Sequence, residues 1–457
     1  MSDDARYVDL SAPAEVPWLA GVLEEAGFEA WAVGGAVRDA LSGSAPEDWD
    51  LTTSARPADV RRAFRRTVPI GIEHGTVGVI GRSGRMYEVT TYRRDVETFG
   101  RKARVVFADR LEEDLARRDF TINAVAWHPL THEVRDPHGG MRDLEDRILR
   151  TVGDPELRFA EDRLRVLRAL RFAGRFHLRI EEATERAVSA SADKLGNLSA
   201  ERVREELWKV LSLQREASAT LRLYERSGVL VALYPELAAC LVARGDDLDG
   251  TGWDFLMRAV DAVSPAHPRV RLAALLHLTA PIGGGDGTGE GGEGAMADPG
   301  HRAAAAAAAA RTVLRRLRCS NADIDTVTHL IAQHASLPSA DAPDPDIRRW
   351  VRRVGRDHLR AMFRLLLAIC RAQPATGRFE SEVLILWRRA RTVARSPVPL
   401  AVSDLAISGD DLRAIGITPG PLYGVILQQL LERVTDEPAL NEREALLTLA
   451  RAEAEKL

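Results

Sequence analysis

The stretch Trp31–Thr53 constrains the fold of this 457-residue chain more than any other. A short apolar run, Trp31–Val33, predicts a strand that breaks at Gly34 and Gly35, and a helix can begin at about Val37. Glycines remove side chains where a backbone must approach a phosphate closely. Arg38, just beyond them, offers a guanidinium to the same phosphate. The pattern predicts a strand, a glycine turn and a helix arranged around a phosphate.

The same stretch continues into a second predicted strand that carries Asp48-Trp49-Asp50. Alternate residues of a strand share a face, so we expect Asp48 and Asp50 to project together. Adjacent carboxylates repel one another unless a cation lies between them. Mg2+ takes oxygen ligands and shares them with the phosphates of a substrate. A lone glycine pair is usually a turn and a lone Asp-x-Asp a solvated loop, but their combination indicates metal-dependent nucleotidyl transfer.

Four motifs in order carry a resemblance to a known family. The stretch resembles the signature of the tRNA nucleotidyltransferase and bacterial poly(A) polymerase family, the class II branch of the polymerase-beta-like superfamily. Downstream segments resemble its second and third motifs and its Glu-Asp-x-x-Arg motif, at Arg117–Ala124 (RRDFTINA), Asp136–Leu144 (DPHGGMRDL) and Glu161–Arg165 (EDRLR).

This resemblance implies an α+β chain. A nucleotidyltransferase head with a small mixed sheet would occupy residues 1–150, followed by an all-helical neck, body and tail. The neck, with a base-selecting helix, would span residues 151–215. The body, at 216–340, is similar to a degenerate HD phosphohydrolase domain. The tail, at 341–457, would bind RNA.

The resemblance also implies an activity, which is template-independent addition of CCA to tRNA 3′ ends from CTP and ATP with release of pyrophosphate. A-only addition and poly(A) synthesis remain alternatives. The partner would be the tRNA acceptor stem and elbow, not DNA. Asp48 and Asp50 would be the catalytic residues and hold two Mg2+ ions. The residues expected to bind the nucleotide are Gly34, Gly35, Arg38, Arg118, Asp119, Asn123, Asp162, Arg165, Arg168 and Arg171.

Phe159–Phe176 has the apolar spacing of one amphipathic helix. On such a helix Asp162 and Arg165 lie at i and i+3 and share a face. A carboxylate only accepts and a guanidinium only donates hydrogen bonds, so together they match the amino group and ring acceptors of cytosine and adenine. The alternative is a salt-bridged surface helix.

Two features flank the second motif. Glu88, on a predicted strand Met86–Thr91, is either a third carboxylate beside Asp48 and Asp50 or a plain surface glutamate. The segment Tyr92–Arg110 loses periodicity and is predicted to be a mobile loop. By resemblance, a loop at this place is associated with the addition of the final adenosine.

The stretch that resembles an HD domain lacks key ligands. Leu278 follows His277 where the family has aspartate, and Phe255 stands where a leading histidine is expected; His301 and His334 remain. With one carboxylate and one imidazole missing, the site has too few ligands for a metal. We therefore expect no hydrolase activity from this region.

Charge and cysteine usage exclude several other classes of protein. The net charge of −4 argues against a general nucleic-acid coat, so RNA binding would rely on local basic surface. Three widely spaced cysteines predict neither a disulfide framework nor a zinc site. The chain shows no signal peptide and no run of about 18 apolar residues, which predicts a cytoplasmic protein without a membrane span. The sequence leaves a monomer and a homodimer both open.

Overall fold

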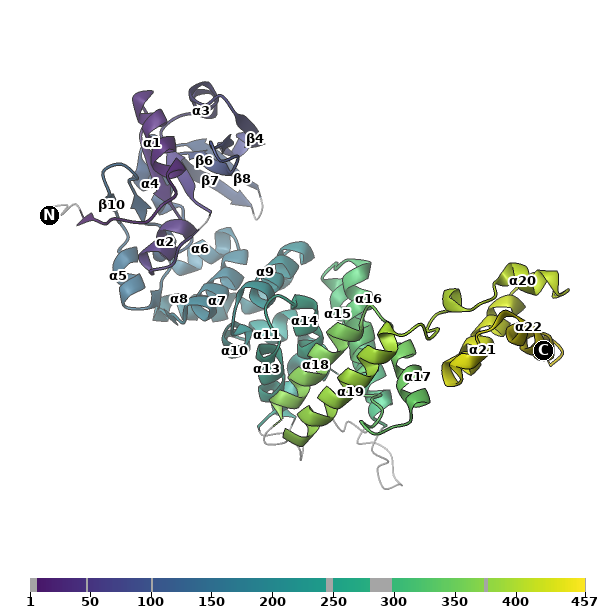
Figure 1. Ribbon diagram of the computed structural model, residues 1–457. Helices are drawn as coiled ribbons and strands as arrows, with labels where there is room; N and C mark the ends of the chain where they lie inside the picture. Colours follow the sequence, from purple (N-terminus) through teal and green to yellow (C-terminus); the bar gives the residue numbers. More distant parts are fainter. Residues whose placement is uncertain are drawn as a thin grey trace. The chain divides into compact units, whose positions relative to one another are not determined.

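The computed structural model describes residues 6–46, 48–99, 102–243, 250–279, 298–373 and 377–456. The chain divides into two compact units. The first comprises Met1–Glu206 and Ala219–Leu233, and the second Leu207–Ser218 and Tyr234–Leu457. The first contains a large β-sheet with helices, whereas the described part of the second is helical (Figure 1). The chain is thus an α+β head followed by helices, as the sequence predicts.

The sheet of the first unit has eight strands in the order β1-β10-β9-β2-β3-β6-β5-β4. Neighbouring strands are antiparallel except β3 and β6, which run parallel, so the predicted mixed sheet is confirmed. In this spatial order the strands are Arg6–Tyr7, Glu133–Arg135, Ala126–Trp127, Ala30–Val33, Asp50–Thr53, Met86–Thr91, Thr76–Ile80 and Thr67–Gly71.

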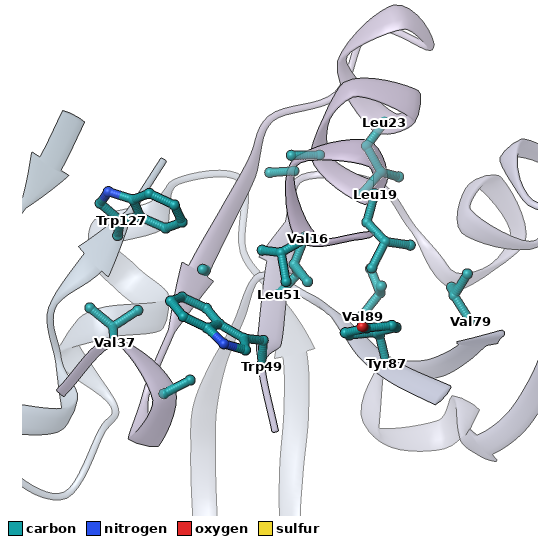
Figure 2. Packing of buried hydrophobic residues seen from close by; sticks show 14 of the residues in the cluster. Val16, Leu19, Leu23, Val37, Trp49, Leu51, Val79, Tyr87, Val89 and Trp127 are labelled. Atoms are coloured by element: carbon teal, nitrogen blue, oxygen red, sulfur yellow. The ribbon is translucent and has the colours of Figure 1, made fainter. Parts of the chain in front are cut away.

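One face of this sheet is covered by the apolar core of the head. Leu19 and Leu23 of α1 (Glu15–Glu25) lie in one cluster with Leu51, Val79 and Val89 from the central strands (Figure 2). Trp49 belongs to the same cluster, fully buried, and its ring lies 5.6 Å from that of Trp127. β3 begins at Asp50, so Asp48 precedes the strand instead of lying in it. The predicted alternation nevertheless holds, because Trp49 is buried while Asp48 and Asp50 are exposed.

The prediction of a loop at Tyr92–Arg110 is wrong. The segment forms two antiparallel strands, β7 (Arg93–Phe99) and β8 (Lys102–Phe107). The base of this hairpin is fixed by long-range contacts that local sequence does not reveal. The ring of Phe107 lies where a side chain on Gly75 would be, 2.8 Å from an added Cβ. Gly75 also has a φ of 84°, which favours glycine.

The prediction of one helix over Phe159–Phe176 is also wrong. The segment forms α6 (Pro155–Glu161) and α7 (Leu164–Phe176). Asp162 interrupts them with an extended backbone, φ −148° and ψ 105°. Its Oδ1 accepts a hydrogen bond from the Leu164 N–H at 3.1 Å. Aspartate side chains compete for backbone N–H groups in this way, which favours a helix start over a helix interior.

The remaining elements of the first unit are short helices and one small parallel strand pair, with α9 and α10 shared between the units. They are α2 (Gly35–Leu41), α3 (Pro57–Ala63), η1 (Ile72–His74), α4 (Leu111–Ala116), η2 (Thr121–Asn123), α5 (Gly140–Glu145), β11 (Ile148–Leu149), β12 (Arg179–Ile180), α8 (Glu182–Ser191), η3 (Ala192–Asn197), α9 (Ala200–Leu213), α10 (Ala217–Arg226) and α11 (Val229–Leu233).

The second unit continues with helices, and its final residues have an apolar cluster of their own around Leu412, Leu430 and Leu446. Its elements are η4 (Pro235–Leu237), α12 (Ala238–Val242), α13 (Gly252–Ala262), α14 (Pro268–Leu276), α15 (Pro299–Arg316), α16 (Asn321–Gln333), α17 (Asp344–Val354), α18 (Leu359–Ala372), α19 (Gly377–Arg395), η5 (Val402–Asp404), α20 (Gly409–Ala414), α21 (Leu422–Asp436), η6 (Pro438–Leu440) and α22 (Arg443–Ala454). None of the described helices is both long enough and apolar enough to cross a bilayer. The four-part division at residues 150, 215 and 340 stays a prediction.

Candidate active site

The predicted glycine turn follows β2. Gly34 has φ 80° and ψ −136°, a conformation that side chains disfavour, and α2 begins at Gly35. A Cβ built on Gly34 would lie 3.2 Å from Nη1 of Arg118. The absence of a side chain therefore leaves the turn's backbone directly beside a guanidinium. The first and second motifs therefore meet in space.

A chain of polar contacts joins α2, η2 and α7 behind this turn. Arg38 donates from Nη1 to Oδ1 of Asn123 at 2.5 Å, and Asn123 donates from Nδ2 to Oδ1 of Asp119 at 2.9 Å. Arg168 donates from Nε to the other oxygen of Asp119 at 2.8 Å. Burial acts to raise the pKa of Asp119, but Arg168 and Asn123 hold it below its ordinary value. The predicted residues Arg38, Asp119, Asn123 and Arg168 thus form one polar network, of which only Arg168 is partly exposed.

Arg38 is buried within this network rather than open to a ligand. Its Nε and Nη2 both donate to Oδ1 of Asp39, at 2.8 and 2.6 Å. Its guanidinium also lies 5.0 Å from the ring centre of Phe172 and 4.6 Å from that of Phe176. Arg38 therefore holds α2 in place below the glycine turn.

Arg118 has an acidic partner that the sequence reasoning missed. Asp114 of α4 is fully buried and accepts hydrogen bonds from Arg118 Nη2 at 3.1 Å and from Arg117 Nε at 2.9 Å. It also accepts from Thr52 of β3 at 3.3 Å and from the backbone N–H of Arg93 at 3.4 Å. The spacing of Asp114 to the two arginines, i+3 and i+4, was the available signal.

Arg118 keeps donor capacity for a ligand. Its Nε is buried and has no hydrogen-bond partner among the residues that the structure describes. A guanidinium N–H pairs well with an anionic oxygen, so this donor suits a phosphate. The bare glycine turn at Gly34 lies next to the same side chain.

Three acidic residues lie on neighbouring parts of the sheet: Asp48 just before β3, Asp50 at its first residue and Glu88 within β6. Leu51 of β3 pairs with Val89 of β6 in parallel register, which brings the preceding residues, Asp50 and Glu88, side by side. Partial burial, the charge of Glu88 and, more weakly, that of Asp48 raise the pKa of Asp50 to about 6, whereas Arg118 acts in the opposite direction. Glu88 is thus a close neighbour of Asp50, as a third carboxylate would be.

The uncompensated repulsion at Asp50 fits a divalent cation. Mutually repelling carboxylate oxygens are the donors that Mg2+ prefers. Within the described ranges, no three histidine, cysteine or acidic residues are grouped closely enough to hold an ion by themselves. A metal here would complete its coordination with water and substrate phosphates, as Mg2+ commonly does.

The predicted base-reading residues have protein partners in this structure. Arg202 donates to both oxygens of Asp162, at 3.0 and 2.7 Å. Arg165 donates to the carbonyl of Arg158 at 3.0 Å and to Glu161. Because the helix breaks at Asp162, the expectation that Asp162 and Arg165 share one helical face is wrong.

Arg171, predicted to extend this face, is 5% exposed. Its Nε donates to Oε2 of Glu206 at 2.7 Å, and its guanidinium lies 4.3 Å from the ring centre of Phe172. Contact between Arg171 and a nucleotide would require this ion pair to open.

In the second unit, three aromatic rings of the HD-like stretch pack against one another. The rings of His277 and His334 are perpendicular with centres 5.4 Å apart, and the ring of Phe255 lies 5.9 Å from His277. Nδ1 of each histidine contacts a backbone carbonyl oxygen, that of Ala274 or Ile331. His301 is exposed on α15. The expected lack of hydrolase activity stays a prediction.

Comparisons with known proteins agree with the arrangement of the head. Family models described as "Poly A polymerase head domain", "Probable RNA and SrmB- binding site of polymerase A" and "tRNA nucleotidyltransferase domain 2 putative" match residues 30–150, 177–241 and 301–450. The CCA-adding enzyme of Lactiplantibacillus plantarum is 33% identical over 441 residues, which cover 95% of this chain and 94% of that enzyme. The chain belongs to the CCA-adding enzyme family.

Other CCA-adding enzymes support this membership over different lengths. The enzyme of Lactobacillus helveticus is 46% identical over 190 residues, and this match covers 41% of the chain and only 47% of that enzyme. The solved structure of the Bacillus stearothermophilus CCA-adding enzyme in complex with CTP superposes with a TM-score of 0.70 at 27% identity, covering 97% of both chains.

Proposed function

We propose that this chain adds C, C and A to the 3′ end of tRNA, taking CMP from CTP and AMP from ATP, releasing pyrophosphate and using no nucleic-acid template. The observation that carries this proposal is the position of Asp50, beside Glu88 and within the electrostatic reach of Arg118. Membership of the CCA-adding family over nearly the whole chain supports the same activity.

In this proposal, some residues of the head bind the metal ions and others bind the triphosphate. Asp48 and Asp50 would hold two Mg2+ ions, which when bound lower the pKa of the attacking 3′-hydroxyl and stabilise the leaving pyrophosphate. Glu88 is placed to share in this binding. The bare turn at Gly34 and Gly35 and the free Nε of Arg118 receive the triphosphate and neutralise charge that builds up on it.

Polar contacts around the glycine turn keep this arrangement rigid. Arg38, Asn123, Asp119 and Arg168 tie α2 to α7, and Asp114 fixes Arg118. Transfer is sensitive to small displacements of the reacting groups, because most of the rate gain comes from position and preorganised charge.

We also propose that Asp162 and Arg165 read the base. Their present partners, Arg202 and Glu161, would then have to be exchanged for the Watson–Crick edge of cytosine or adenine. Uracil and guanine would leave the carboxylate without a donor and the guanidinium without an acceptor. Exchanging the pair, Asp162→Arg with Arg165→Asp, should therefore lower CTP and ATP use relative to UTP and GTP.

The activity is tested by product length. The protein is incubated with tRNA that lacks CCA, lacks only A, or is complete, together with CTP, ATP or both. We expect three nucleotides on the first RNA and one on the second, with no extension of the third. A-only addition would extend the second RNA alone, and poly(A) synthesis would give long ATP-dependent products from all three.

A further inference from the structure

Three exposed apolar side chains lie on the same sheet face as Glu88. Val68, Ile70 and Met86 are 40%, 42% and 48% exposed. Met86 is two residues before Glu88 in β6, while Tyr87 between them is buried in the core. Alternate residues of a strand share a face, so Met86 and Glu88 project together. An apolar surface therefore adjoins the proposed catalytic carboxylates.

Gly78 makes this surface continuous with Glu88. In the antiparallel pairing of β5 and β6, Gly78 lies directly opposite Glu88, and in that of β4 and β5 it lies opposite Val68. A Cβ on Gly78 would be 2.5 Å from Cδ1 of Ile70 and 3.0 Å from Sδ of Met86. The two side chains thus converge over a position that has no side chain of its own.

The direction of the reaction assigns this surface to one substrate. In nucleotidyl transfer the attacking and leaving oxygens lie on opposite sides of the phosphorus. The glycine turn that receives the triphosphate follows β2, and the sheet continues from β2 through β3, β6 and β5 to β4. The leaving pyrophosphate is then on the β2 side of Asp50. The 3′-hydroxyl must arrive from the side of Glu88, β5 and β4.

We propose that Val68, Ile70 and Met86 form the subsite for the base of the RNA's 3′-terminal nucleotide; this rests on the proposed function. During CCA addition the terminal base changes at each step, from the discriminator base to the first and then the second cytosine. An aliphatic surface has no hydrogen-bonding groups with which to prefer one base, so it accepts each in turn by apolar contact alone. Selection is then left to the incoming nucleotide.

A double-mutant cycle tests the subsite, with one change in the protein and the other in the RNA. The RNA is tRNA lacking CCA, with either its normal terminal nucleotide or an abasic ribose that retains the 3′-hydroxyl and the phosphates. The variant is Ile70→Ser with Met86→Ser. The matched control is Leu130→Ser, which alters a side chain of the head that is 43% exposed and lies outside this surface.

We expect the parent protein to lose about tenfold in kcat/KM for CMP addition on the abasic RNA, the loss of one modest apolar contact. The variant should lose a similar factor on normal RNA through a higher KM for RNA, and nothing further on abasic RNA. Its KM for CTP should stay within about twofold of the parent's. Leu130→Ser should keep the parent's preference for the normal RNA.

The subsite would be refuted, and the proposed function left intact, by either of two results. The first is that the losses in kcat/KM from the protein change and from the abasic RNA add up; the second is that the parent extends both RNAs equally. Failure of the parent on both RNAs would instead refute the proposed function. Light scattering tests a second copy of the chain as the occupant, since a dimer lost in the variant together with additive kinetics would assign the surface to self-association. If circular dichroism shows the double variant unfolded, Met86→Ser alone carries the same cycle.

Discussion

Two places in this molecule bring ionisable side chains together, and they do so in opposite ways. In the head, Asp48, Asp50 and Glu88 lie at the surface; desolvation at Asp50 and, after it, repulsion by Glu88 and Asp48 raise the pKa of Asp50 to about 6, and Arg118 offsets this rise only in part. In the second unit, His277 and His334 are in mutual contact, and burial and the neighbouring His334 lower the pKa of His277 to about 3. At neutral pH the carboxylates of the head are charged, whereas His277 is neutral.

The difference distinguishes the proposed ligand-binding site of the head from the packed interior around the two histidines. The carboxylates have free oxygen lone pairs facing solvent, so a cation can relieve their repulsion. Each histidine contacts a backbone carbonyl through Nδ1, and His277 packs against Phe255. Burial lowers the pKa of both imidazoles, which favours their neutral form. A perturbed pKa alone would mark both places as functional, but exposure and unpaired charge select only the first.

The largest expected effect comes from removing one charge of the carboxylate group. Asp50→Asn preserves the shape of the side chain but removes a metal ligand, so C and A addition should both fall on the order of a thousandfold or more. Single-turnover rates with CTP and with ATP measure this. Near-parental transfer of either nucleotide by a folded variant would contradict the metal assignment.

Asp114 sharpens the comparison because it is a buried carboxylate whose charge is paired. Asp114→Asn should misplace Arg118 and lower kcat/KM for both nucleotides by roughly tenfold to a hundredfold. Glu112→Gln, an exposed neighbour in α4, is the control and should be nearly neutral. If both variants behave alike, Asp114 does not position Arg118.

The activity should depend on pH through the protonation of Asp50. The folded metal-free protein takes up a proton at Asp50 as the pH falls through about 6, whereas an unfolded aspartate does so at 3.8. The burial and repulsion of the charged carboxylate are therefore a cost above pH 6 that acid relieves, but acid also protonates the proposed metal ligand. At limiting Mg2+, activity should fall about tenfold per pH unit below 6.

Saturating Mg2+ competes with the proton and should move this fall in activity to lower pH. Rates measured from pH 5 to 8 at two Mg2+ concentrations test the prediction. A fall in rate at the same pH under both conditions would show that a group other than the metal ligand titrates.

The smallest effect on transfer is expected at His277. His277→Leu should leave CTP and ATP addition within about twofold of the parent's. Stability that depends on neutral His277 is present above pH 6.5 and is lost as the pH falls toward 3, since only the unfolded histidine takes up a proton. Between pH 8 and 5 the parent should lose about 2 kcal/mol more than the variant. Urea unfolding at both pH values measures this, and equal losses would refute the assignment.

The structural features predicted correctly from sequence belong to local patterns. Gly34 and the pair Asp48 and Asp50 are recognisable because a turn and a two-residue alternation are decided within a few positions. The break at Asp162 escaped detection because aspartate fits the polar face of a helix as well as it caps a new one. The partners of Asp114 in β3 and β7 depend on strand pairing, and the hairpin at Arg93–Phe107 depends on anchoring at Gly75. Neither of these is a property of the local sequence.

The buried indole of Trp49 has a consequence for assembly of the catalytic centre. A slip of one residue in the pairing of β3 would turn every side chain of the strand to the other face. Asp50 would then be driven into an apolar core at a severe energetic cost, and Trp49, which directly precedes the strand, would lose its buried position. Misregistered molecules are therefore eliminated during folding rather than left as inactive enzyme. Because the proposed metal ligands flank this indole, the register that buries Trp49 also sets the positions of Asp48 and Asp50, so the fraction of folded protein should equal the fraction able to bind Mg2+.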